Sequence, residues 1–280
     1  MGVESRARKV EEVDSDLEQL PKATSDAARI LADRRPELAL QAHQAEWHVR
    51  GIQYHCQNFY SHYRSFIGEA SKRLQSGADV IIMYSPESQR MMFEFYALVI
   101  LARITFDNLR FYIHTVFATP FPQLPKSITD FFEGQTNCPI YEQCRSDPRI
   151  QYLIDIRNCL VHHRSFATSD NAILVKEGTS PSDVLAHSSI SSMTRGSFRL
   201  VGENGVAVNV FLPDKIYDRS GSDTKLARFT YEARWHILSM SFAFATVASE
   251  VVASTLLLVA STDGQPFRYE KKRRGKAGGA

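Results

Sequence analysis

Apolar positions recur every three or four residues through most of the chain, which is the spacing of amphipathic helices. Ser25 and Asp26 can cap one such helix, and prolines mark several boundaries. The pattern predicts helices over residues 25–36, 37–51, 56–75, 86–117, 127–132 and 149–165. Residues 1–22 are charged and weakly periodic, so they are expected to form a flexible arm. The chain is therefore expected to be mainly α, with residues 23–170 forming a helical bundle.

A different pattern begins after this helical part. Residues 172–175 form a short apolar run, and the segments 197–201 and 206–212 flank Asn204-Gly205, a strong hairpin signal. Apolar side chains alternate along 206–212, so one face of the ribbon is expected to be buried. Residues 171–221 are predicted to form a small antiparallel β insertion before the last helix.

The segment 222–263 is expected to be a long apolar helix, starting at about Lys225, that completes the bundle. Residues 235–261 contain one charged side chain, Glu250, so the stretch is long enough to span a membrane. A central carboxylate opposes insertion by about 2.5–3.5 kcal/mol. We therefore expect a buried helix and no membrane contact, with a membrane span as the alternative. Residues 264–280 are predicted to be a basic, disordered tail, and contact of this tail with RNA phosphate is a further alternative.

Composition narrows the chemistry. The net charge of +2 arises from 33 basic and 31 acidic residues, so any RNA site must be local. Four cysteines without a C-x-x-C pair favour a reducing cytoplasm. His55 and His62 can share a helix face beside Cys56, but the second ligand pair typical of a zinc site is missing. Neither a metal nor a cofactor is expected, and phosphate-binding loops and common hydrolase motifs are absent.

The predicted helix 149–165 carries side chains suited to cutting RNA without a metal. His162 can move a proton near neutral pH, and the planar guanidinium of Arg157 matches phosphate oxygens. On a helical projection Arg157 falls in the apolar arc, so it is either a core ion-pair member or a phosphate ligand. The arc contains Leu153, Ile154, Ile156, Leu160 and Val161, and Asp155, Asn158, Cys159 and His162 fall opposite.

Arg157 and His162 are separated by about 140° on a regular helix, too far to reach one phosphate. Either the helix ends near His162, or two chains share the site. His163 is a second candidate for the proton-transfer role, because its position would suit a helix that ends one residue later.

The run from Tyr152 to His163 resembles the signature helix of the HEPN superfamily: an Arg, a polar residue, a few mostly apolar residues and a His. The resemblance implies a four- or five-helix bundle in which the motifs of two protomers line one cleft. It also implies metal-independent RNA cleavage that leaves a 2′,3′-cyclic phosphate. Carried onto this chain, Arg157 stabilises the phosphate, Asn158 supports it through its amide, and His162 acts as acid or base.

A second stripe supports a polar site. Arg103, Asp107, Arg110 and His114 are spaced to share one helix face, with Tyr96 above them. Asp107 is expected to pair with Arg157 or to orient His162, and the alternative is a set of surface ion pairs. Asp155 and His163 complete the supporting residues.

The sequence thus predicts a cytoplasmic, homodimeric endoribonuclease that acts on RNA. The resemblance adds a setting in antiviral defence or a toxin–antitoxin pair, with an antitoxin or other regulatory protein as partner. The alternative is an inactive HEPN-like module that binds RNA or a protein. A membrane-associated helical protein is a third reading.

Overall fold

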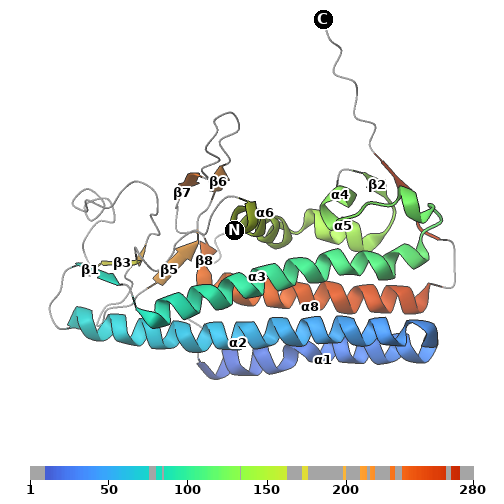
Figure 1. The fold of residues 1–280 in the computed structure, drawn as a ribbon. Coiled ribbons are helices and arrows are strands. Elements are labelled where there is room, and N and C mark those ends of the chain that lie inside the picture. The colour runs from blue at the N-terminus through green and yellow to red at the C-terminus, as the bar shows by residue number, and fades with distance from the viewer. Residues whose placement is uncertain are drawn as a thin grey trace, which may run out of the picture.

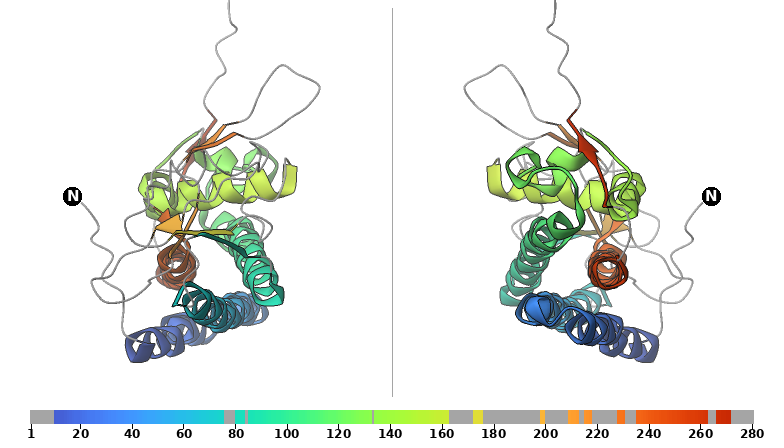
Figure 2. Two further views of the ribbon diagram at one scale, coloured as in Figure 1. Left: turned by 90° about the vertical axis from the view of Figure 1, so that its left-hand side faces the viewer. Right: turned by 90° about the vertical axis from the view of Figure 1, so that its right-hand side faces the viewer.

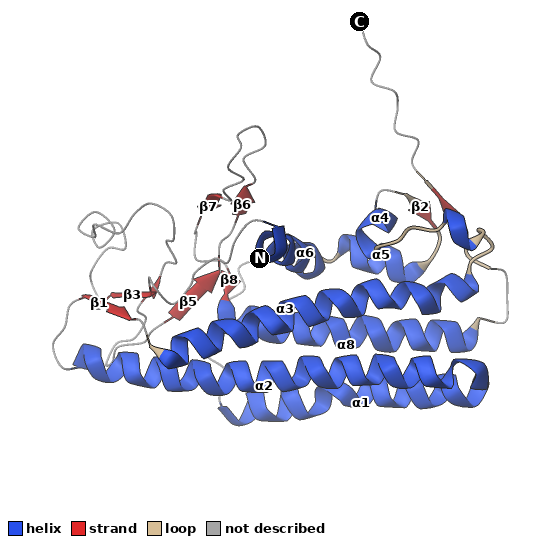
Figure 3. Ribbon diagram, in the orientation of Figure 1, coloured by secondary structure: helices blue, strands red, loops and turns tan. Residues whose placement is uncertain are grey.

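The structure is a computed structural model, and it is mainly helical, as predicted (Figure 3). It describes residues 10–75, 80–83, 85–132, 134–162, 172–175, 198–199, 209–212, 215–217, 228–230, 235–262 and 266–271. The helices are α1 (Val10–Arg34), α2 (Ala39–Gln75), α3 (Pro86–Ile113), α4 (Ile128–Phe132), α5 (Pro139–Ser146), α6 (Pro148–His162) and α8 (Ile237–Ser261). Short 3-10 turns span Pro36–Leu38, His114–Val116 and Phe121–Gln123.

Four long helices, α1, α2, α3 and α8, pack lengthwise into a bundle (Figures 1 and 2). Fully buried aromatic rings join them: Phe95 of α3 lies between Phe59 of α2 and Phe244 of α8, with ring centroids 6.1 and 6.4 Å away. Further along, Phe117 forms a β-bridge with Phe267, so α3 and α8 run in the same direction. The apolar side chains that recur along these helices thus pack together in one core.

Helix α8 is the most deeply buried element. Among the described residues it is the one helix long and apolar enough to cross a membrane, but 67% of its most apolar window is buried in the protein. Ser249, within α8, donates a hydrogen bond to the carbonyl of Leu20 and lies 3.2 Å from the hydroxyl of Thr24. Glu250 instead faces outward, half exposed. The burial of the last helix therefore agrees with the prediction.

Helix α2 is continuous through Gly51, where the sequence predicts a break. A Cβ at Gly51 would lie 2.8 Å from Leu101 Cδ2, so glycine allows α2 to approach α3 closely here. Further along α2, the Nδ1 atoms of His55 and His62 lie 2.7 Å from the carboxylates of Glu94 and Glu87 on α3. Packing against α3 outweighs the low helix propensity of glycine.

The strands are short and antiparallel: β1 (Val80–Met83) with β3 (Ala172–Val175), β2 (Gln135–Thr136) with β9 (Tyr269–Glu270), β4 (Phe198–Arg199) with β5 (Asn209–Leu212), β5 with β8 (Trp235–His236), and β6 (Lys215–Tyr217) with β7 (Arg228–Thr230). The pairing of β4 with β5 agrees with the predicted ribbon, and Val210 and Leu212 are buried as the alternation requires. The turn at Asn204-Gly205 lies outside the described residues.

The β region extends beyond the predicted 171–221. Strand β1 precedes it in the chain, and β7 and β8 occupy positions that we expected to be helical. The last helix begins at Ile237, so the predicted start near Lys225 is wrong. Aromatic and β-branched side chains between 228 and 236 favour strands once neighbouring strands are available.

Both predicted disordered ends are partly ordered. Helix α1 begins at Val10, so the arm is wrong for residues 10–22, and Ser25 donates to Glu46 on α2 (2.8 Å) instead of capping a helix. Within the predicted tail, Tyr269 is buried and lies over Gly134, where a Cβ would overlap its ring. Helix α5 lies between the predicted helices 127–132 and 149–165, in a segment where no helix was predicted. Tertiary contacts order each of these segments.

His236, which ends β8, is a partly buried titratable group beside the core. Its Nε2 atom lies 3.3 Å from the hydroxyl of Tyr63, and burial lowers its pKa from 6.5 to about 4. Burial also lowers the pKa of His114 to about 4, assisted by repulsion from Arg110. Both imidazoles are therefore neutral in the folded protein at pH 5–7. Below about pH 6.5 the unfolded chain binds protons that the folded chain does not, so stability falls as the pH decreases toward 4.

The substitution His236→Gln should reduce this loss of stability at low pH. Because His236 stays neutral in the folded protein, it lowers the free energy of unfolding by about 1–2 kcal/mol between pH 7 and pH 5. Over the same pH range, the loss in the variant should be smaller by this amount. Urea unfolding at the two pH values measures the difference, with His43→Gln on the surface of α2 as the matched control. A variant profile parallel to the wild type would contradict the assignment.

Candidate functional site

Helix α6 lies across α3 and α8 on one side of the bundle (Figures 1 and 2). The carboxylate of Asp147 accepts a hydrogen bond from the backbone N–H of Arg149 (2.8 Å), so the helix starts at Pro148, as predicted from Asp147-Pro148. Tyr152 stacks on Trp235 with ring centroids 4.9 Å apart and also packs on Phe244. These contacts hold the motif helix against the core.

The faces of α6 are close to those predicted, with two corrections. Leu153, Ile154 and Ile156 are buried, whereas Asp155 is exposed. Cys159, placed with the polar residues in the projection, is buried, and Val161, placed in the apolar arc, is 49% exposed. Cys159 packs inward because α6 is covered from two sides, by α3 and by α8, and so buries more than one stripe.

The motif arginine lies at the edge of the buried face. Arg157 is half-buried, and its Nη1 atom donates a hydrogen bond to Oδ1 of Asn158 (3.2 Å). Arg157 and Asn158, two of the predicted catalytic residues, therefore lie side by side.

Asp155 lies on the exposed side of α6. Burial nevertheless raises the pKa of its carboxyl, because the surrounding protein removes part of its water.

Arg103 of α3 provides a second guanidinium near Arg157. It is 5% exposed, its Nη2 atom donates to the hydroxyl of Thr129 (2.7 Å), and it forms an ion pair with Asp107 (3.3 Å). Its Nε and Nη1 atoms are buried and find no hydrogen-bond partner among the described residues. Burial lowers the pKa of Arg103 most, attraction to Asp107 raises it, repulsion from Arg157 lowers it, and attraction to Asp130 raises it.

Asp107 and Asp130 both raise the pKa of Arg103, so carboxylates offset positive charge of the two guanidinium groups. An arginine with unsatisfied buried donors is rare in folded proteins, because each missing hydrogen bond is unfavourable by about 1–3 kcal/mol. The unsatisfied donors of Arg103 lie where α3, α4 and α6 meet. The spacing of Arg103 and Asp107 indicated their pairing, but the proximity to Arg157 and the contribution of Thr129 had no sequence signal.

Asp107 connects α3 to the start of α4. Besides Arg103, its carboxylate accepts a hydrogen bond from the backbone N–H of Ile128 (3.1 Å). Its pairing with Arg157 or with His162 remains a prediction. The pair with Arg103 differs from the surface ion pairs considered as the alternative, because Arg103 is buried.

His162 is the last described residue of α6. The helix is continuous from Arg157 to this point, so their backbone positions stay about 140° apart. Asp155 precedes His162 by two turns on the same face, which is about 10 Å along the axis and too far for a direct hydrogen bond. His163 lies outside the described residues.

Other candidate groups do not join this site. Arg110 lies over the ring of Phe111 (4.7 Å), and His114 packs edge-on against Phe121. Cys56 is buried in the core while His55 pairs with α3, so the considered zinc ligands do not converge. Among the described residues no three metal-binding side chains cluster.

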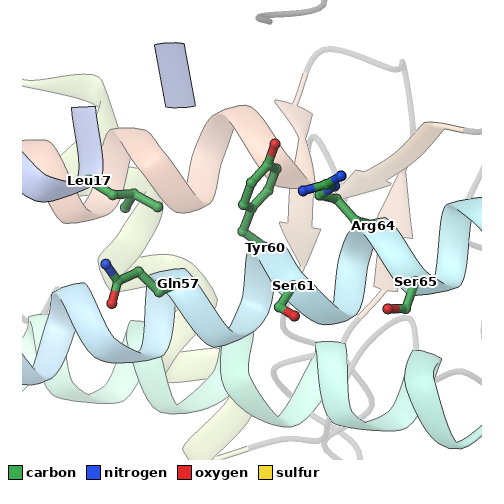
Figure 4. A pocket seen from close by; sticks show the side chains of 6 residues that line it. All are labelled: Leu17, Gln57, Tyr60, Ser61, Arg64 and Ser65. Carbon is green, nitrogen blue, oxygen red and sulfur yellow. The ribbon is translucent and has the colours of Figure 1, made fainter. Parts of the chain in front are cut away.

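An open pocket of about 500 Å³ lies elsewhere, along α2 near Leu17 of α1 (Figure 4). Arg64 lies 5.8 Å from the ring centroid of Tyr60 at its margin. The pocket is lined by Leu17, Gln57, Tyr60, Ser61, Arg64 and Ser65. None of the predicted site residues contributes to it.

Removing the carboxylate of Asp107 should show how strongly the ion pair with Arg103 contributes to stability. Asp107→Ala leaves a buried guanidinium without its counter-charge and should destabilise the protein by about 2–4 kcal/mol. The double variant with Arg103→Met should be less destabilised than the sum of the single variants. Asp107→Asn keeps an acceptor for the Ile128 N–H and separates that hydrogen bond from the charge. Urea unfolding measures the free energy of unfolding of the wild type and of these four variants, and additive effects would show that the pair is not coupled.

Similarity to known proteins does not identify this site. No protein-family model matches the chain, and neither the curated proteins nor the solved structures contain a match. The interpretation of the site therefore depends on the motif of α6 and on the geometry around Arg103 and Arg157.

Proposed function

We propose that this protein is a metal-independent endoribonuclease of the HEPN type, with Arg157, Asn158 and His162 as its catalytic residues. The observation that carries the proposal is the half-buried motif arginine beside a second, buried guanidinium with unfilled donors. Such a site can bind a phosphodiester, because the planar guanidinium of Arg157 matches phosphate oxygens in shape and charge.

The two arginines have different parts in this proposal. Arg157 is half-exposed and can contact a phosphate oxygen, whereas Arg103 is enclosed and acts through its field. Arg103 thereby favours an anion at Arg157 without touching it. The amide of Asn158, which already accepts from Arg157, holds that guanidinium in place.

The reaction requires a second copy of the chain. Because α6 is helical up to His162, one chain cannot direct both Arg157 and His162 at the same phosphate. Two α6 helices that cross antiparallel at the level of Cys159 would bring His162 of each copy to the level of Ile156 of the other, between Asp155 and Arg157. The half-exposed Val161 on this end of α6 can contribute to such a contact.

In the proposed reaction a base removes the proton of the 2′-hydroxyl, and the oxygen attacks phosphorus. The bond from phosphorus to the 5′-oxygen breaks, and an acid returns a proton to that oxygen. The products are a 2′,3′-cyclic phosphate and a 5′-hydroxyl, and His162 carries one or both proton transfers. The buried α8 supports a cytoplasmic protein without a membrane span. A regulatory protein partner in a defence or toxin–antitoxin setting completes the proposal.

The test is cleavage of labelled RNA by the purified protein in EDTA. His162→Ala should lower the cleavage rate by about 100-fold or more, because a positioned acid or base contributes that much. Arg157→Lys should also lower it, since lysine lacks the bidentate fork. Arg145→Lys, on the exposed side of α5, is the matched control and should cleave as the wild type does.

The remaining outcomes distinguish the alternatives. His163→Ala separates the two adjacent histidines, and loss of activity in that variant alone would move the proton-transfer role to His163. RNA binding without cleavage at any pH would favour the inactive binding module. Cleavage that needs a metal, or that survives His162→Ala together with His163→Ala, would contradict the mechanism.

A further inference from the structure

Large apolar side chains are exposed on the outer faces of α2 and α3. On α2 three large apolar side chains repeat every seven residues: Leu40, Trp47 and Tyr54. On α3 a second row runs beside them: Phe93, Ile100, Ile104 and Phe111. Their exposed fractions lie between 38% and 68%. We name these seven residues the α2–α3 face.

The two rows are neighbours because contacts between the helices set their register. The Tyr112 hydroxyl donates to the Gln41 carbonyl, Gly51 lies against Leu101, and His55 pairs with Glu94. At this register Leu40 lies beside Phe111, Trp47 beside Ile104, and Tyr54 between the levels of Phe93 and Ile100. The two rows thus lie at matching levels along α2 and α3, and we infer that together they make one patch.

The size of this patch matches one half of a stable protein interface. Aromatic side chains bury about 150–250 Å² each, so the four partly exposed rings alone would cover roughly 500 Å². A standard interface buries about 800 Å² per partner, and the largest apolar patch of a typical monomer is about 300–600 Å². Two rows of large apolar side chains exposed to water are typical of a surface that binds protein.

We propose that the α2–α3 face binds the same face of a second copy of this chain. A two-fold axis parallel to the seam would place α2 of one copy over α3 of the other, with the levels along the helices unchanged. Trp47, the largest side chain, then meets the less exposed Ile100 and Ile104 of the second copy. Leu40 meets Phe111, and Tyr54 meets Phe93, so large side chains are opposed by smaller or offset ones.

This interface is separate from the α6 contact of the proposed function and does not depend on it. Along α3 the exposed row lies next to the stripe that contains Arg103 and Asp107, and α6 packs on the far side of that stripe. Two independent two-fold contacts would build a closed assembly of four chains if their axes cross at right angles. The interface can therefore be tested without RNA.

The experiment measures mass in solution by light scattering after gel filtration. The wild type should show at least twice the 31.7 kDa mass of the chain. The assembly formed by the double variant Trp47→Glu/Ile104→Glu should contain half as many chains as that of the wild type. The dissociation constant of this interface should rise by at least about 30-fold, as expected for a central aromatic contact. All substituted side chains are exposed, so circular dichroism and the unfolding temperature should match the wild type.

Three controls decide the result. Leu257→Glu places the same charge at a comparably exposed site on α8 and should leave the mass unchanged. Trp47→Phe should retain the interface. Val161→Glu probes the α6 contact. A monomeric wild type, an unchanged mass in the double variant, or binding of this face to lipid vesicles without self-association would overturn the proposal. RNA cleavage by the double variant is expected to persist, so the two proposals can fail separately.

Discussion

The need to bury α8 determines the rest of this structure. A helix that is apolar on nearly all sides must be surrounded by other elements, because a single neighbour covers only one stripe. Helices α1, α2 and α3 supply three sides, and α6 lies over α3 and α8. Glu250 and Leu257 mark the narrow strip that stays exposed. The position of the motif helix is thus a consequence of the burial of α8.

The same packing explains why the candidate site is electrostatically strained. When α6 covers α3, it encloses Arg103 and brings Arg157 within its field. Asp107 forms an ion pair with Arg103, and the hydroxyl of Thr129 accepts a hydrogen bond from it. Two other guanidinium nitrogens of Arg103 have no hydrogen-bond partner among the described residues. Core positions are usually apolar, and the proposed anion-binding role depends on this buried charge.

The α3 helix separates two surfaces of opposite character. One side of it carries Arg103 and Asp107 toward α6, and the adjacent side carries the exposed row of Phe93, Ile100, Ile104 and Phe111. A polar, charged site and a large apolar patch on neighbouring faces suit a protein in which chemistry and association use different contacts. Both features depend on α3 being fixed by α2 and α8.

The sequence by itself determined the helical class, the burial of the last helix and the local order of Arg157, Asn158 and His162, because these follow from periodicity and spacing. It did not determine where segments with weak local signals become ordered: α1 extends to Val10, α2 continues through Gly51, and residues 228–236 contain strands, each through contacts with distant partners. Only the tertiary structure brought Arg103 and Thr129 to the motif and placed Cys159 inside and Val161 outside. The reason is physical: helical spacing specifies which residues share a face, whereas the number of neighbours on each face decides how much of it is buried.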